Sequence, residues 1–192
     1  MSFVRSIMLE ADLASVVVTE EMIRERIWAL GAQITEDYRT KGDLTVLCVT
    51  NGAVVFAADL IRAIKMPLRL ECISVSAYHD EEPALHLSEL EAGIRLDLRG
   101  RHLLLMDDVI DTGRTLNRLA TALAHLKPAS LRTCVLISKE GRRQVNYNAD
   151  YAGFEIVDQF VVGYGLDFAE QYRNLRCIGV LKSDFQNPPI WQ

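Results

Sequence analysis

The stretch of sequence that decides the fold reads Leu103-Leu104-Leu105-Met106-Asp107-Asp108-Val109-Ile110-Asp111-Thr112-Gly113-Arg114-Thr115-Leu116. It begins with four apolar residues, which are typical of a strand buried on both faces of a parallel sheet. Two adjacent acids and a turn with threonine and glycine follow. Leucines then recur at helical spacing, so the turn leads into an amphipathic helix over residues 113–126. Ligands of open parallel sheets bind beyond the carboxyl ends of the strands, which makes this turn a candidate ligand site.

The rest of the chain repeats the alternation of strand and helix. Apolar runs predict strands over residues 44–49, 68–75, 102–106 and 131–138, and helical periodicity predicts helices over residues 19–38 and 53–64. The pattern is less regular after Arg143, where residues 160–165 and 177–181 are short strand candidates. We therefore predict an α/β fold in which helices cover both faces of a central, parallel, twisted sheet.

The composition argues against a nucleic-acid or membrane protein. Of the 192 residues, 49 % are hydrophobic and 24 % are charged, and the formal net charge is −5. A nucleic-acid binder usually has a basic excess, whereas the dense basic cluster over residues 139–143 is short. No apolar run approaches the roughly 20 residues that span a bilayer. Glu10 and Asp12 precede the first apolar run, which is not the order of a signal peptide, so we expect a cytoplasmic protein.

The cysteines give no sign of a metal site or of disulfide bonds. Cys48, Cys72, Cys134 and Cys177 are scattered without paired spacing. Three of them lie in apolar stretches that are predicted as strands. We expect reduced thiols in the core.

The turn after the two acids has the chemistry of a phosphate site. Consecutive N–H groups at the start of a helix attract an anion, and the helix dipole reinforces them. Thr112 and Thr115 add hydroxyl donors, and Gly113 has no Cβ that would keep a phosphate from the backbone. The carboxylates of Asp107 and Asp108 suit the hydroxyl groups of a sugar and a divalent cation. Each feature alone is common in structural turns, but this order of strand, acids, turn and helix is specific.

The quoted stretch resembles the diphosphate-sugar binding motif of type I phosphoribosyltransferases. Enzymes of this family use phosphoribosyl diphosphate (PRPP) together with magnesium. Three further segments resemble the hypoxanthine-guanine phosphoribosyltransferase family, namely residues 154–167, Tyr172-Arg173-Asn174-Leu175, and Ile137-Ser138-Lys139 with the downstream Arg142-Arg143. The likeness covers most of the chain and is weakest over residues 77–98. It implies one phosphoribosyltransferase domain over residues 1–192, with a small hood built from roughly residues 1–18 and 150–192.

The resemblance also assigns roles on the base side of such a site. Asp111 would exchange a proton with N7 of the purine while N9 attacks the ribose. Lys139 would donate to the 6-oxo group, which adenine lacks. Phe160 would stack on the purine ring, and the backbone of Val161 would read the other edge of the base.

Further roles follow for the PRPP side. Asp107, Asp108 and Asp167 would hold Mg²⁺, and Arg173 would contact the diphosphate. The other positions that the resemblance places against substrate are Asn51, Gly52, Tyr78, Thr112, Gly113, Arg114 and Thr115.

The chain departs from the family pattern at three places. Asp107 stands where many members have glutamate. The turn Thr50-Asn51-Gly52 lacks the Lys or Arg that often precedes its glycine, and the sequence does not decide whether it holds the cis peptide of the family. Residues 77–89, the expected closing loop, keep Tyr78 but have Ala77 in place of a serine.

The resemblance implies an enzyme that transfers the phosphoribosyl group of PRPP to hypoxanthine or guanine, in a homodimer or homotetramer. Two alternatives stay open at this point. One is a relative that prefers xanthine, because Val161 contributes backbone atoms only. The other is a PRPP-sensing regulator that binds RNA or DNA, against which the acidic charge and the presence of both Asp111 and Lys139 argue.

Overall fold

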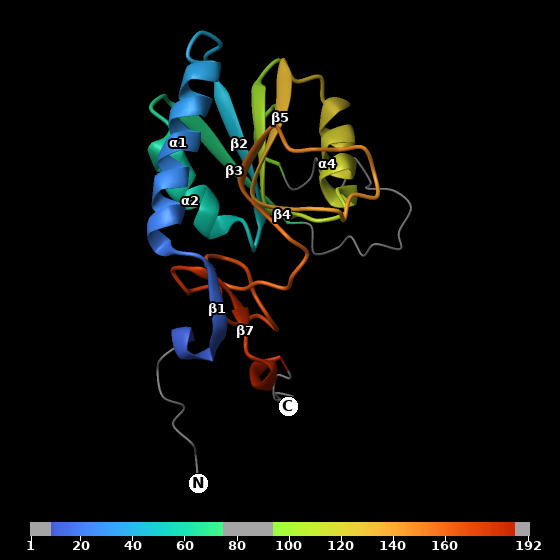
Figure 1. Cartoon of the computed structure of the whole chain (residues 1–192). Helices are drawn as coiled ribbons and strands as arrows, with labels where there is room; N and C mark the ends of the chain where they lie inside the picture. The colour runs from blue at the N-terminus through green and yellow to red at the C-terminus, as the bar shows by residue number, and fades with distance from the viewer. Residues whose placement is uncertain (1–8, 75–93, 187–192) are drawn as a thin grey trace.

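The computed structural model describes residues 9–74 and 94–186. Its elements, in chain order, are η1 Leu9–Asp12, β1 Leu13–Val18, α1 Glu20–Tyr38, β2 Leu44–Thr50, α2 Val54–Ala63, β3 Leu68–Ser74, β4 His102–Ile110, α4 Arg114–Ala124, β5 Ser130–Lys139, β6 Tyr151–Ile156, β7 Ile178–Leu181 and η2 Ser183–Phe185. The central sheet has the strand order β3-β2-β4-β5-β6 and is parallel throughout. Helices α1 and α2 cover one face and α4 covers the other (Figure 1), which confirms the predicted α/β architecture.

The helices form where the periodicity predicted them. The hydroxyl of Thr19 caps α1 by accepting a hydrogen bond from the N–H of Met22 at 3.2 Å. The apolar face of α1 is buried against the sheet through Ile23, Ile27, Leu30 and Ile34. On the opposite face, α4 packs a stripe of leucines and an alanine, Leu116, Leu119, Ala122 and Leu123.

Three predictions about the strands need correction. Strand β4 does not end at Met106 but continues to Ile110, because Asp107, Val109 and Ile110 still pair with β5. Strand β6 is an edge strand that the sequence pattern did not predict. Residues 160–165 are not a strand, because Gly163, Tyr164 and Gly165 have positive φ values of 104°, 52° and 102°.

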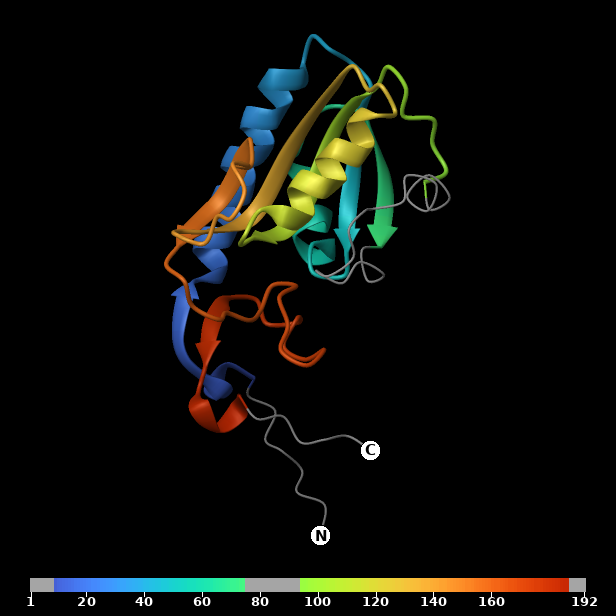
Figure 2. The same ribbon diagram turned by 90° about the vertical axis from the view of Figure 1, so that its right-hand side faces the viewer.

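A small hood lies beyond the carboxyl ends of the central strands. It contains a two-stranded antiparallel sheet of β1 and β7, and the arrowheads of β2 and β3 point toward it (Figure 2). We expected the C-terminal part of the hood to begin near residue 150, but Tyr151–Ile156 belongs to the main sheet, so the hood begins after Ile156. The loops at this end of the sheet are therefore enclosed between sheet and hood.

Two further observations concern the core and the helices. Cys48, Cys134 and Cys177 are buried free thiols as expected, whereas Cys72 is exposed on the edge strand β3. Among the helices of the described ranges, none is long and apolar enough to cross a membrane.

Candidate active site

The turn between β4 and α4 presents the open start of a helix. Gly113 occupies the N-cap position with φ of +81°, and no side chain caps the helix. The first i→i−4 bond runs from the N–H of Asn117 to the Gly113 carbonyl at 3.0 Å. Thr112 accepts a long bond of 3.4 Å from the N–H of Arg114, and Thr115 is exposed. An open helix start of this kind suits an anion, and the phosphate site at this turn stays a prediction.

Local packing gives a second reason for glycine at position 113, besides the predicted close approach of a phosphate. A Cβ at this position would lie 3.2 Å from Val145 Cγ2 and 3.4 Å from Arg143 Cδ. The segment that follows β5 thus fills the space beside the glycine. This segment is also hydrogen-bonded to the turn, because the N–H of Gln144 donates to the Thr112 carbonyl at 3.0 Å. The left-handed φ and this close packing select glycine here.

The two acids of β4 lie side by side with their carboxylates withdrawn from water. Asp107 is only 8 % exposed, and its Oδ1 accepts the N–H of Asp108 at 2.9 Å. Asp108 Oδ1 accepts the N–H of Val109 at 2.7 Å. Burial, and then the negative charge of Asp108, raise the pKa of Asp107 well above its usual range. Burial also raises the pKa of Asp108, although hydrogen bonds to its carboxylate oppose the change.

Close backbone packing joins the acids to the hood. The peptide Thr50–Asn51 is cis, which answers the question that the sequence left open. A Cβ on Gly52 would lie 1.7 Å from Asp108 Oδ2, and a Cβ on Gly165 would lie 2.3 Å from the Gly52 carbonyl. Only glycine fits at both places, so the β2–α2 turn, the end of β4 and the hood meet at a single point.

Arg173 of the hood faces this point. Its Nη1 donates to the Gly165 carbonyl at 2.8 Å, and its Nη2 lies 2.9 Å from Asp167 Oδ1. The carboxylate of Asp167 also accepts the N–H of Glu170 at 2.9 Å. Arg173 and Asp167 are thus held as a pair beside the β4 acids.

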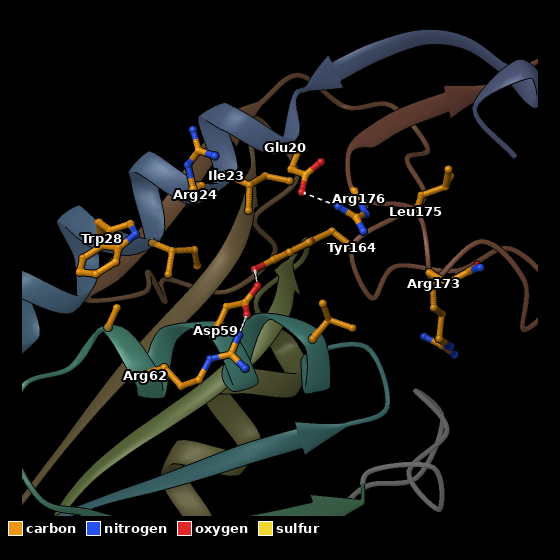
Figure 3. Close-up of a pocket in the computed structure, with 14 residues that line it drawn as sticks. Glu20, Ile23, Arg24, Trp28, Asp59, Arg62, Tyr164, Arg173, Leu175 and Arg176 are labelled. Carbon is orange, nitrogen blue, oxygen red and sulfur yellow. Dashed lines mark hydrogen bonds and ion pairs between the residues drawn. The ribbon is translucent and has the colours of Figure 1, made fainter. Parts of the chain in front are cut away.

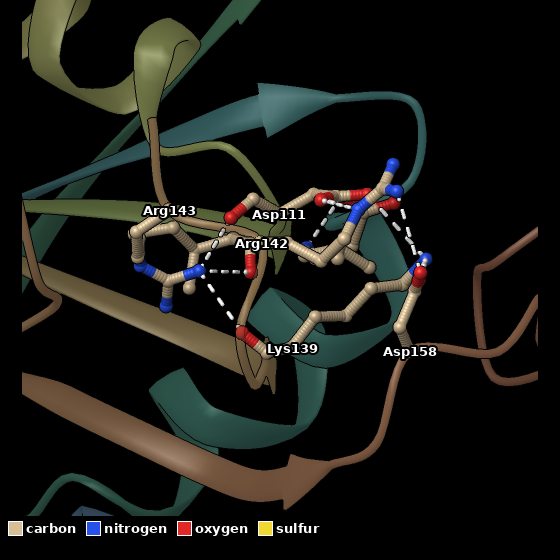
Figure 4. Close-up of polar contacts among 8 residues, drawn as sticks. Asp111, Lys139, Arg142, Arg143 and Asp158 are labelled. Atoms are coloured by element: carbon tan, nitrogen blue, oxygen red, sulfur yellow. Dashed lines mark hydrogen bonds and ion pairs between the residues drawn. The ribbon is translucent and has the colours of Figure 1, made fainter. Parts of the chain in front are cut away.

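Asp111 belongs to a second group of charges, at the other side of the turn. Lys139 Nζ lies 3.5 Å from its Oδ2, and Arg142 Nε donates to its Oδ1 at 3.0 Å (Figure 4). Burial acts to raise the pKa of Asp111, but the hydrogen bond from Arg142 and the charge of Lys139 outweigh it, so the pKa is lowered. Asp111 is therefore a carboxylate at neutral pH.

Arg143 holds the same group in place through the backbone. Its Nη1 donates to the carbonyls of Ile110, Asp111 and Lys139, and its Nη2 donates to Ser138 Oγ at 2.9 Å. These acceptors lie at the ends of β4 and β5. The guanidinium therefore fixes the position of Asp111 relative to Lys139.

Phe160 is exposed and Val161 is buried, which is compatible with a stacking role for the ring of Phe160 and a backbone role for Val161. Phe160 is 53 % exposed and meets Phe168 edge to face, with ring centroids 5.6 Å apart. Val161 is buried, so its side chain packs in the core. Tyr78 and the rest of the expected closing loop lie outside the described residues.

Comparisons with known proteins identify the family. The model of the phosphoribosyl transferase domain matches residues 19–169. The hypoxanthine-guanine phosphoribosyltransferase of Mycobacterium tuberculosis is 41 % identical over 94 % of this chain and 90 % of that protein. The hypoxanthine phosphoribosyltransferase of Haemophilus influenzae is 39 % identical over 85 % and 93 %.

A solved structure agrees. A lysine-to-arginine mutant of the hypoxanthine phosphoribosyltransferase of Trypanosoma cruzi, in a ternary substrates complex, superimposes with a TM-score of 0.82 at 37 % identity over 91 % of this chain and 98 % of that one. Another structure of the T. cruzi enzyme concerns the role of its C-terminal region in oligomeric state and activity.

This chain belongs to the hypoxanthine-guanine phosphoribosyltransferase family. Its fold is the type I phosphoribosyltransferase fold. Most positions that the sequence singled out gather at the carboxyl ends of β2, β4 and β5, as in an open α/β site.

Two charged members of the site were not predicted from the sequence. Neither Arg142 nor Asp158 was singled out as a site residue, yet Arg142 contacts Asp111, and Asp158 contacts both Arg142 and Lys139. A charged residue in a loop gives no local signal of such contacts. The available hints were the dense basic cluster at residues 139–143 and the family resemblance of the segments that contain the two residues, neither of which assigned them a role.

A cavity of about 490 Å³ lies beside this site rather than over it (Figure 3). Its lining comes from α1, α2 and residues 164–176, including Trp28, Asp59, Tyr164 and Arg173. Tyr164 closes one wall by donating to Asp59 Oδ2 at 2.5 Å. The cavity shares Arg173 with the site but contains neither Asp111 nor Lys139.

Proposed function

We propose that this protein transfers the 5-phosphoribosyl group of PRPP to hypoxanthine or guanine and releases diphosphate, with IMP or GMP as product. The observation that carries the proposal is the contact between Asp111 and Lys139 beside an open helix start. A 6-oxopurine presents an N7–H donor and a 6-oxo acceptor along one edge of its ring system. A carboxylate next to an ammonium group is complementary to that edge.

The helix start at Gly113 would bind the 5-phosphate of PRPP. Thr112 and Thr115 would add hydroxyl donors, and Arg114, the first residue of α4, would add charge. Asp107 and Asp108 would accept hydrogen bonds from the ribose hydroxyls. This arrangement would hold the sugar with its C1′ toward the base.

The diphosphate would lie where the β2–α2 turn meets the hood. Asn51 and Gly52 would offer backbone N–H groups there, and Arg173 would supply positive charge. Asp167 would remain paired with Arg173 and reach the ligand shell through water.

The residues present fit Mg²⁺ when the substrate supplies most of the ligands. Within residues 9–74 and 94–186, no cluster of three or more His, Cys, Asp or Glu could form a complete protein cage. Asp107 and Asp108 are, however, adjacent acids, one buried and one partly buried, with raised pKa values, and a divalent cation would relieve their repulsion. Mg²⁺ commonly binds through one or two carboxylates together with substrate phosphates, and would neutralise charge on the diphosphate. Asp107 and Asp108 would hold it directly.

On the base side, Phe160 would stack on the purine and the backbone of Val161 would bind its far edge. Lys139 would donate to the 6-oxo group. Asp111 would accept the N7 proton as N9 attacks C1′, because its lowered pKa keeps it a carboxylate. The positioned charges would stabilise an oxocarbenium-like ribose as the diphosphate departs, and Tyr78 would cover the site.

An assay of PRPP consumption with hypoxanthine, guanine, xanthine and adenine tests the proposal. We expect turnover with hypoxanthine and guanine and none above background with adenine. Xanthine as the best substrate would instead favour the xanthine-preferring alternative. Adenine as the best substrate would show that Lys139 does not read the 6-position.

We also propose that the chain forms a homodimer or homotetramer. Trp28 is 58 % exposed at the rim of the cavity in Figure 3, next to Lys65, whose Nζ lies 5.1 Å from the indole centroid. A second copy that covers this rim would bury the indole. Light scattering of the wild-type protein and of Trp28→Gln tests this, and a wild-type monomer at working concentration would refute it.

A further inference from the structure

Four charged side chains around the base site share their partners. Arg142 Nε lies 3.0 Å from Asp111 Oδ1, and Arg142 Nη1 lies 3.3 Å from Asp158 Oδ2. Lys139 Nζ lies 3.5 Å from Asp111 Oδ2 and 3.8 Å from Asp158 Oδ1. Both cations therefore contact both acids, and the four groups form an alternating ring (Figure 4).

The members of this ring come from three separate parts of the chain. Asp111 follows β4, Lys139 ends β5 and Arg142 lies just after it, while Asp158 lies in the link from β6 to the hood, two residues before Phe160. Among the described residues, Asp158 is the one acid besides Asp111 that contacts these two cations.

The neighbouring Arg143 stands outside the ring. Its guanidinium donates to backbone carbonyls and to the hydroxyl of Ser138, and not to either acid. The charge balance of the ring is therefore set by its own two cations and two acids.

The proposed function creates a conflict at Asp111. Its carboxylate must accept a hydrogen bond from N7 of the base, yet in this structure its oxygens bind Arg142 and Lys139. Lys139 can exchange Asp111 for the 6-oxo group of the base. Arg142 has no such exchange with the base, and Asp158 is the second carboxylate that it already contacts.

We infer that Asp158 is a positioning residue that takes over Arg142 when a 6-oxopurine binds, and so releases Asp111 to the N7 proton. The inference rests on the proposed function. Arg142 already holds Asp158 through Nη1 at 3.3 Å, so the exchange needs a rotation of the guanidinium and no movement of the backbone. Asp158 does not itself contact the reacting atoms.

Two hypoxanthine analogues separate this role from a structural one. 9-Deazahypoxanthine keeps the N–H at position 7 and has carbon at position 9, so it can donate to Asp111. 7-Deazahypoxanthine has carbon at position 7 and cannot. Both keep the 6-oxo group, so the ratio of their inhibition constants against hypoxanthine, at saturating PRPP and Mg²⁺, isolates the contact with Asp111.

Asp158→Asn and Arg142→Gln should change this ratio in opposite directions. In Asp158→Asn, Arg142 has Asp111 as its remaining carboxylate, so 9-deazahypoxanthine should bind about threefold to tenfold more weakly while 7-deazahypoxanthine changes little. In Arg142→Gln the competitor for Asp111 is gone, so 9-deazahypoxanthine should gain affinity relative to 7-deazahypoxanthine. In the double variant the effect of Asp158→Asn should largely disappear, because Arg142, the cation that Asp158 would take over, is absent.

Asp43→Asn is a matched control. Asp43 also lies between two arginines, with Arg69 at 2.8 Å and Arg101 at 3.9 Å, but at the amino end of the sheet. It should leave the ratio unchanged. The inference is overturned if Asp158→Asn leaves the ratio within twofold of wild type, weakens both analogues equally, or acts in the same direction as Arg142→Gln. Failure of the wild-type protein to use hypoxanthine would instead reject the proposed function.

Discussion

Charged side chains are paired differently at the two ends of the central sheet. At the amino end of β5, Arg132 Nη1 lies 2.6 Å from Asp37 Oδ2, and the Tyr151 hydroxyl donates to the same oxygen at 2.6 Å. At the carboxyl end, Asp107 and Asp108 lie next to each other in a single strand. The hydrogen bond from Tyr151 lowers the pKa of Asp37, helped by Arg132 and partly opposed by burial, whereas burial and a like charge raise the pKa of Asp107.

This contrast separates the part of the molecule that stabilises it from the part that we propose binds substrate. Charges at the amino end are paired within the protein and need no ligand. Charges at the carboxyl end repel one another or share partners, and a bound substrate would resolve both situations. Substitutions at the carboxyl end should therefore change substrate binding and rate, and those at the amino end should change stability.

Asp111→Asn should have the largest effect on rate. The amide keeps the size of the side chain but cannot accept the N7 proton, so kcat with hypoxanthine should fall by about 10²–10⁴-fold. The KM for PRPP should change little, because Asp111 is proposed to face the base. Steady-state kinetics decide this, and near-normal turnover would leave Asp111 as a residue that only shapes the turn.

Asp108→Asn should mainly weaken PRPP. Loss of a charge-assisted hydrogen bond typically costs about 1.5–3 kcal/mol, so the KM for PRPP should rise by roughly 10- to 100-fold. The fall in kcat should be smaller than for Asp111→Asn. If both variants showed the same balance of kcat and KM, the two sides of the turn would not have separate roles.

Arg132→Gln tests the amino end. It breaks a half-exposed pair with Asp37, so the free energy of unfolding should fall by only about 1 kcal/mol in urea denaturation. The KM values for PRPP and hypoxanthine should stay within about twofold of wild type. A large change in either KM would mean that the two ends of the sheet are coupled.

The stability difference between Asp107→Asn and wild type should depend on pH. The folded pKa of Asp107 is raised, so the cost of its charge is present above that pKa and absent below the unfolded carboxyl pKa of about 3.9. The variant should therefore be the more stable protein near neutral pH, and its advantage should shrink as the pH falls. Thermal denaturation from pH 7 down to pH 4 checks the trend, and an advantage that grows on acidification would contradict it.

Much of the fold could be predicted from the sequence because its core strands are uniformly apolar and its helices are strongly periodic. Strand β6 was missed because Gly153 and Glu155 interrupt its short apolar pattern. Residues 160–165 were mistaken for a strand because apolar residues give no sign of the positive φ angles at Tyr164 and its neighbours.

The site was predictable where its residues follow one another and hidden where they meet through folding. The turn from Asp107 to Thr115 is contiguous, so its chemistry follows directly from the order of its residues. The places of Arg142 and Asp158 in the site become apparent only from their contacts in the folded chain. The packing against Gly113 was likewise hidden, because a later segment of the chain approaches it.

The central claim is that the charged residues at the carboxyl end of the sheet are arranged to bind a ligand. This arrangement lowers the stability of the protein without ligand. The most direct test is the melting temperature of wild type and Asp107→Asn at pH 7, with and without PRPP and Mg²⁺. Without ligand, the variant should melt higher, by about 2–4 °C for each kcal/mol of relieved repulsion. With ligand, wild type should rise and the variant should not. A variant that melts below wild type without ligand, and is still stabilised by PRPP, would contradict the account.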